Sequence, residues 1–209
     1  MKLLNAALGA LMAGLVSMPV YAQTESNIVC PVGQVSGMSL DDEFGPGTSD
    51  LTNCITKRAQ VKMVVQINQF KNANGTAYGL GNITNIIDDY EITHGMVRGR
   101  DYEIVVVLHG PGGMMALTDK GINGAGVEVA SRNPFQSQIE GLIAKGVKVY
   151  FCQNTTRAYL SNGTLPKYSV TADPNKTATS QLIPGVEYTT AGLTSIADFQ
   201  ARGYQYIQP

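Results

Sequence analysis

Residues 101–110 read DYEIVVVLHG, and five consecutive apolar residues, Ile104 to Leu108, lie at their centre. An unbroken, Val-rich run of this length is typical of a strand that is covered on both faces, as in a parallel sheet. A Gly-rich connection, PGGMMALTDKGINGAG, follows it. The stretch therefore predicts a central strand of an α/β sheet.

Strand and helix patterns alternate on both sides of this stretch. We predict further strands at residues 59–70, 147–152, 185–190 and 204–208, and helices at residues 83–95, 133–146 and 191–203. In the helix at 133–146, Asn133 is the expected N-cap and Pro134 the first residue. Such alternation predicts βαβ units, and hence an α/β fold with a doubly wound, mainly parallel sheet of four to six strands.

The N-terminal 22 residues have the pattern of a secretory signal. Lys2 precedes an apolar run that ends in Val-Tyr-Ala, so we expect cleavage after Ala22 and a periplasmic location; the alternative is an uncleaved anchor. Residues 23–58 are rich in turn-forming residues and predict an irregular extension. The α/β domain is expected at 59–209, with an exposed insertion near 162–183.

Composition excludes several classes of function. The formal charge is −1 and basic residues do not cluster, which argues against nucleic-acid binding. With 2 histidines and 3 dispersed cysteines, a structural zinc site is not expected. The sequence GPGGMM lacks the Gly-Lys-Ser/Thr of a phosphate-binding loop, and we expect neither a metal nor a cofactor.

The 3 cysteines are Cys30, Cys54 and Cys152. In an oxidising compartment thiols tend to pair, and the loop-like segment between Cys30 and Cys54 would gain from a disulfide. We therefore predict a Cys30–Cys54 disulfide and a free Cys152. Two alternatives stay open, namely that all three are unpaired or that Cys152 is a paired one.

Cys152 ends the predicted strand VKVYFC and precedes the polar turn QNTTR. A helix that starts just beyond it would aim backbone N–H groups at the sulfur, Arg157 would add positive charge, and Asn154 would donate a hydrogen bond. Helix N-termini and nearby cations lower the pKa of a thiol. The alternatives are that Cys152 is a small buried hydrophobic residue, and that Arg157 is a solvated charge or pairs with a carboxylate at a subunit contact.

His109 closes the strand at 101–110, and ligands of open α/β sheets bind outside the carboxyl ends of the strands. If the two strands are neighbours, His109 and Cys152 lie at one rim. There the histidine would be a base or a hydrogen-bond partner, or would simply bond a loop carbonyl. The glycines Gly110, Gly112 and Gly113 would let a ligand approach the backbone closely.

The segments IVVVLHGPG, IEGLIAKGVKVYFCQNT and LIPGVEYTTAGLTSIADFQARGYQYIQP together resemble the exported branch of the DsrE/DsrF-like family. The similarity runs from about residue 60 to 209. It implies a flavodoxin-like α/β fold, assembled into trimers or hexamers. In the cytoplasmic relatives a cysteine after a central strand accepts sulfur as a persulfide, and Cys152 is the residue that matches it.

Three functions follow as hypotheses. The first is a periplasmic sulfur carrier or sulfurtransferase that uses Cys152 and exchanges sulfur with a partner protein or a small thiol. The second is a non-catalytic oligomeric module that binds a small anion or thiol. The third is a structural oligomer with a buried cysteine.

Overall fold

Five parallel strands form the central sheet of this computed structural model, which describes residues 34–35, 38–48, 50, 60–122, 128–129, 131–166 and 177–209. Their order across the sheet is β8-β7-β4-β3-β9. In chain order they are β3 (Val61–Ile67), β4 (Tyr102–Leu108), β7 (Lys148–Cys152), β8 (Val186–Thr189) and β9 (Gln205–Ile207). The α/β class and the mainly parallel sheet expected from the sequence are confirmed.

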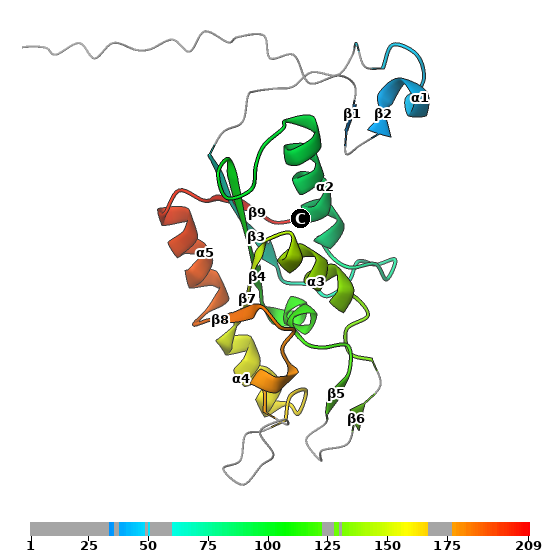
Figure 1. The fold of residues 1–209 in the computed structure, drawn as a ribbon. Coiled ribbons are helices and arrows are strands. Elements are labelled where there is room, and N and C mark those ends of the chain that lie inside the picture. Colours follow the sequence, from blue (N-terminus) through cyan, green and yellow to red (C-terminus); the bar gives the residue numbers. More distant parts are fainter. Residues whose placement is uncertain are drawn as a thin grey trace, which may run out of the picture.

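The direction of the strand connections decides which face each helix covers. From β3 the chain steps to β4, β7 and β8 in one direction, through α2 (Leu80–Asp88), α3 (Gln136–Ala144) and α4 (Gln153–Ser161). It then reverses to reach β9 through α5 (Gly192–Ala201). Because crossovers between parallel strands are right-handed, the reversal puts α5 on the opposite face. Figure 1 shows α5 on one side of the sheet and α2 and α3 on the other.

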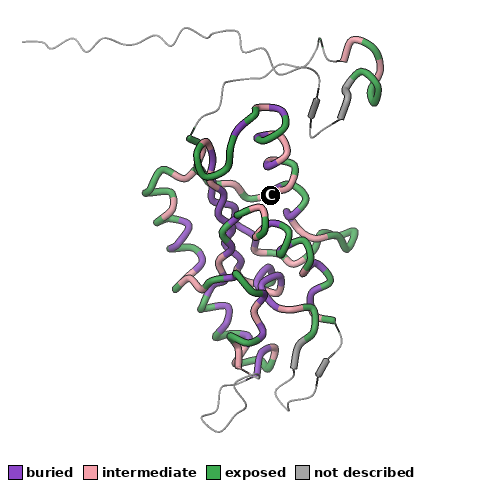
Figure 2. The backbone as a smooth tube through the Cα atoms, viewed as in Figure 1, coloured by how far each residue is buried: buried purple, intermediate pink, exposed green. Residues whose placement is uncertain are grey.

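The two faces of the sheet bury cores of unequal size. On the face of α2, α3 and α4, a large cluster includes Ile67, Leu108, Ile139 and Phe151. On the face of α5, the buried cluster is formed by Val64, Val105, Val107 and Ile196, and Tyr150, Phe199 and Tyr204 pack against it. The strands are accordingly the buried centre of the fold, as the purple tube in Figure 2 shows.

Shorter elements complete the described chain. The π-helix η2 (Asp89–Thr93) continues α2, the 3-10 helix η3 (Gly110–Ala116) follows β4, and the 3-10 helix η5 (Thr179–Gln181) precedes β8. Two short antiparallel pairs are β1 (Gln34–Val35) with β2 (Met38–Ser39), and β5 (Gly121–Ile122) with β6 (Glu128–Val129). A short helix, α1 (Leu40–Phe44), follows β2. In the described part of the chain, no helix is both long and apolar enough to span a bilayer.

Several local predictions need correction. The helix predicted at 83–95 begins earlier, at Leu80 after Gly79, and its last turn is the π-helix. In the last helix, Gly192, Ser195 and Ile196 are buried, whereas Leu193 is 67% exposed. The helical spacing in the sequence predicts a buried stripe of Leu193, Ile196, Ala197 and Gln200, and of these four residues Ile196 alone is buried. The predicted signal at 1–22 and the Cys30–Cys54 disulfide lie outside the described residues.

Asn133 is not the N-cap of α3, which begins at Gln136 with Phe135 as its N-cap. Its side chain is 0% exposed and joins two segments instead. The amide group donates to the carbonyl oxygens of Met115 at 3.0 Å and Leu117 at 2.9 Å, and its oxygen accepts from the backbone N–H of Phe135 at 3.0 Å. Asn133 thus fastens the end of η3 to the start of α3 with three hydrogen bonds.

We predict that Asn133→Ala lowers the free energy of unfolding by about 2 to 4 kcal/mol, because it removes the partners of buried backbone groups. Chemical denaturation measures the loss. Asn85→Ala, at an exposed position of α2, is the matched control and should change stability by less than about 0.5 kcal/mol. Equal effects of the two substitutions would contradict this role of Asn133.

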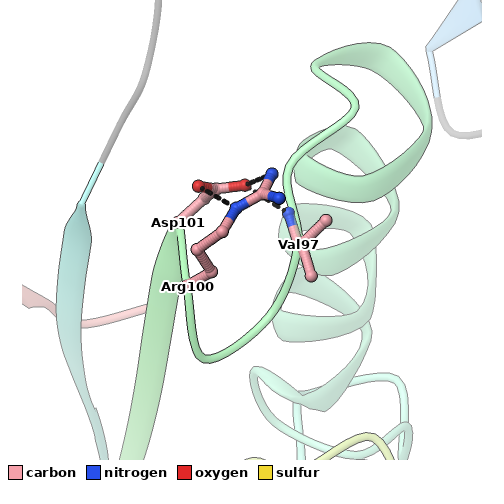
Figure 3. A network of polar contacts seen from close by, with 3 residues as sticks. All are labelled: Val97, Arg100 and Asp101. Carbon is pink, nitrogen blue, oxygen red and sulfur yellow. Dashed lines mark hydrogen bonds and ion pairs between the residues drawn. The ribbon is translucent and has the colours of Figure 1, made fainter.

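A polar network fixes the turn that leads into β4 (Figure 3). Arg100 donates to both carboxylate oxygens of Asp101, at 2.9 and 2.6 Å, and the backbone N–H of Val97 donates to the same carboxylate at 2.7 Å. The hydrogen bond from Arg100, followed by that from Val97, lowers the pKa of Asp101 to about 2. The network lies before the first residue of β4, at the end of the strand opposite His109.

We predict a small stabilising effect of Asp101 that depends on pH. A carboxyl whose folded pKa is lowered contributes stability above its unfolded pKa and loses it as pH falls through the folded value. Asp101→Asn should therefore reduce the unfolding free energy at pH 7, and the difference from the unsubstituted protein should disappear between about pH 4 and pH 2. Asp198→Asn, at an exposed position of α5, is the control without such a network. A difference for Asp101→Asn that stays constant over this range would disprove the linkage.

Candidate functional site

Cys152 and His109 lie at the carboxyl ends of neighbouring strands and on the same face of the sheet. Phe151 and Leu108, which precede them, are paired in the β7–β4 register and belong to the large core. Since successive residues of a strand point to opposite faces, Cys152 and His109 point toward α5. Both line one cavity of about 680 Å³.

The N-termini of two helices, α4 and α5, lie next to the Cys152 sulfur. The residue is the N-cap of α4, and the backbone N–H of Gly192, the first residue of α5, donates to its sulfur at 3.1 Å. In Figure 1 the starts of α4 and α5 lie side by side next to β8. Helix N-termini carry partial positive charge, so both helices favour a thiolate here.

Opposing effects act on the pKa of Cys152, a residue that is only 4% exposed. Burial raises the pKa, while hydrogen bonds from the backbone N–H groups of Thr155, Gly192 and Asn154 and from the Thr155 hydroxyl lower it. The hydrogen bonds prevail, and the net shift is downward. The expected helix start beyond Cys152 is confirmed, and in the described chain Cys152 forms no disulfide.

The glycine loop after β4 is held by α4. The N–H of Gly110 donates to the Thr155 hydroxyl at 2.9 Å, and the Tyr159 hydroxyl donates to the Gly110 carbonyl at 2.8 Å. Thr155 and Tyr159 are four residues apart and therefore on one side of the helix. Neither Thr155 nor Tyr159 is among the site residues predicted from the sequence, although their four-residue spacing in a helix that follows a strand end is visible there.

Close packing accounts for two further glycines of the loop. A Cβ atom at Gly112 would lie 2.5 Å from the carbonyl oxygen of Ile67, and one at Gly113 would lie 2.6 Å from the ring of Phe151. Both glycines are buried and neither lines the cavity, whereas Gly110 does. The loop can therefore lie directly on β3 and β7 only with glycine at these positions.

The other predicted site residues take different positions. Asn154 lines the cavity, and its backbone N–H is one of the groups that lower the pKa of Cys152. Arg157 is exposed on α4 and is not among the described residues that line the cavity. The sequence predicted that both Arg157 and His109 lie beside Cys152. In the structure His109 lines the same cavity as Cys152, whereas Arg157 does not. No group of three or more potential metal ligands occurs in the part of the chain that the structure describes.

A row of hydrogen bonds holds the imidazole of His109. The Gln66 side-chain amide lies 2.7 Å from Nε2 of His109, and the Tyr206 hydroxyl bonds the side chains of both Gln66 and Gln208. Burial lowers the pKa of His109 and so favours the neutral imidazole. The ring bonds a side-chain amide, not the loop carbonyl that the sequence left open as an alternative.

We predict that Gln66→Glu raises the pKa of His109, because a carboxylate accepts a hydrogen bond from the protonated Nε2 and favours the imidazolium. Tyr206→Phe should leave the imidazole neutral but loosen its tautomer, since the Gln66 amide loses a partner. Nitrogen-15 NMR of the imidazole resolves tautomer and titration together. The resonances of His94, which lies 3.6 Å from Asp89, are an internal reference. An unchanged titration of His109 in Gln66→Glu would contradict the contact between the side chain of residue 66 and Nε2 of His109.

The chain is similar to known proteins over most of its length. The model of the DsrE/DsrF-like family matches residues 62–209, which run from β3 past Cys152 to β9. A solved structure described as a protein of unknown function, MTH1491 from Methanobacterium thermoautotrophicum, is 19% identical with a TM-score of 0.49, and the alignment covers 72% of this chain and 100% of that one. A search of curated proteins gives no match.

Proposed function

This chain belongs to the DsrE/DsrF-like family, and we propose that it is an exported sulfur carrier that accepts sulfur on Cys152 as a persulfide. The observation that carries the proposal is the hydrogen bond of 3.1 Å from the Gly192 N–H to the Cys152 sulfur, at the wall of a cavity of about 680 Å³. A sulfur acceptor needs a thiolate that a donor can reach. The lowered pKa of Cys152 supports the first requirement and the cavity supports the second.

His109 has a supporting role in this proposal. Burial favours its neutral form in the wall of the same cavity, and a neutral imidazole can donate one hydrogen bond to a substrate atom. A neutral imidazole does not form an ion pair with the thiolate. The stabilisation of the sulfur anion is therefore assigned to backbone N–H groups and to the Thr155 hydroxyl.

Location and assembly are part of the proposal. The apolar segment at 1–22 supports export to the periplasm, and the family resemblance supports a homotrimer or homohexamer. Sulfur would be exchanged there with a small thiol or with a donor or acceptor protein.

We predict that the rate at which iodoacetamide alkylates Cys152 rises with pH, and that the midpoint of this rise lies below the ordinary thiol pKa of about 8.5. After treatment with inorganic polysulfide, intact mass spectrometry should show a gain of about 32 Da, assigned to Cys152 by peptide mapping and absent from Cys152→Ser. Mapping is necessary because Cys30 and Cys54 are also present. Mapping the added sulfur to another residue would refute the proposal.

Thr155 offers a matched pair of variants for the same assay. Thr155→Val keeps the shape but removes the hydroxyl, so alkylation at pH 7 should slow by on the order of threefold or more, whereas Thr155→Ser should react like the unsubstituted protein.

A second candidate is a binding module in which Cys152 is not a sulfur acceptor. The low exposure of Cys152, 4%, beside a large cavity favours it. Ligand binding that is unchanged in Cys152→Ser, together with the absence of a persulfide, would select this function.

A further inference from the structure

The cavity beside Cys152 has a wall without ionic side chains. Among the described residues that line it, none is Lys, Arg, Asp or Glu. The wall consists of His109, the Gly110-Pro111 turn, Cys152 with one side of α4, and the start of α5. Arg157 is exposed and outside this wall, so its charge is not presented to the cavity.

The remaining titratable side chains of the wall do not supply a positive charge. The Tyr159 hydroxyl donates a hydrogen bond to the Gly110 carbonyl, and His109 bonds the Gln66 amide while burial favours its neutral form. The partial positive charges of the helix starts face the Cys152 sulfur itself. When Cys152 is a thiolate, a second anion in the cavity would be repelled by the sulfur and would find no cationic side chain in the wall.

The size and lining of the cavity indicate an organic group. A volume of about 680 Å³ is far larger than hydrosulfide or thiosulfate requires and lies within the range of sites for small organic ligands. Pro111, Ala158, Ala191 and Leu193 contribute apolar surface. Leu193 is 67% exposed and borders the cavity at the start of α5, so an apolar ligand can cover it.

We infer that the sulfur donor of Cys152 is an organic persulfide that reacts in its protonated form and whose uncharged, apolar carbon group occupies this cavity, and not an inorganic anion such as thiosulfate. The inference rests on the proposed function and specifies its substrate class.

The transfer step balances without an added oxidant or reductant. The Cys152 thiolate attacks the outer sulfur of R–S–SH, a bond forms between the two sulfurs, and the S–S bond of the donor breaks. The leaving thiolate RS⁻ takes the electron pair, and the transferred sulfur keeps its proton. The products are Cys152–S–SH and RS⁻, which is protonated by water.

The test compares three donors at equal concentration: butyl persulfide, the persulfide of 4-mercaptobutanoate, and thiosulfate. Mass spectrometry follows the rate at which each donor transfers sulfur to Cys152. This rate is divided by the rate at which the same donor transfers sulfur to the free thiol N-acetylcysteine, which removes differences in the intrinsic reactivity of the donors. We expect butyl persulfide to load Cys152 at least about tenfold faster than the carboxylated donor on this relative scale, and thiosulfate to be slowest.

Two variants add the same charge at different places. Leu193→Lys introduces a cation at the cavity and should reduce the preference for butyl persulfide several-fold. Asp198→Asn also raises the net charge by one, but Asp198 is exposed on α5 outside the cavity wall, so the preference should not change.

Equal relative rates for the two persulfides, or faster loading by the carboxylated donor, would overturn the substrate class while leaving the sulfur-carrier function in place. Failure of every donor, inorganic polysulfide included, to load Cys152 would overturn both. The donor comparison on the unsubstituted protein decides the matter even if a variant does not fold.

Discussion

The right-handedness of crossovers between parallel strands is the constraint on which this architecture depends. Three steps in one direction place α2, α3 and α4 on one face, and the reversal after β8 places α5 alone on the other. The same reversal brings the start of α5 to the end of β7, where α4 also begins. Two helix N-termini therefore meet at Cys152 because of topology, and no cationic side chain is needed to bring positive potential to the sulfur.

The site uses fixed dipoles where many reactive thiols use a charged partner. Burial lowers the pKa of His109 and favours its neutral form, so the site does not depend on an imidazolium–thiolate pair. The backbone N–H groups of Gly192 and Thr155 cannot be lost by titration, and they are already oriented before any ligand enters. An anion stabilised in this way is less sensitive to salt than one paired with an exposed arginine.

Much of the fold could be predicted from the sequence because burial leaves a direct signal. The apolar run of β4 and the helical spacing of Phe135, Ile139 and Leu142 identified their elements, and the strand-end positions of Cys152 and His109 identified the rim. What escaped prediction depends on contacts between distant residues. Asn133 and Pro134 looked like a helix start, but tertiary bonds to Met115 and Leu117 decided the role of Asn133. Similarly, the Gln66–His109 bond and the Tyr159–Gly110 bond join residues that are distant in the sequence. They can be recognised only when the arrangement of the strands is known.

The placement of β9 beside β3 also affects how the chain folds. The hydrogen bond between Gln66 and Tyr206 joins residues that are 140 positions apart, and contacts of such long sequence separation form slowly because of the entropy of loop closure. The strands β3, β4, β7 and β8 can associate in the order of synthesis, whereas the fifth place in the sheet stays open until residues 205–207 arrive. During that interval β3 is an unprotected edge strand, and its apolar segment from Met63 to Val65 is open to pairing with another chain.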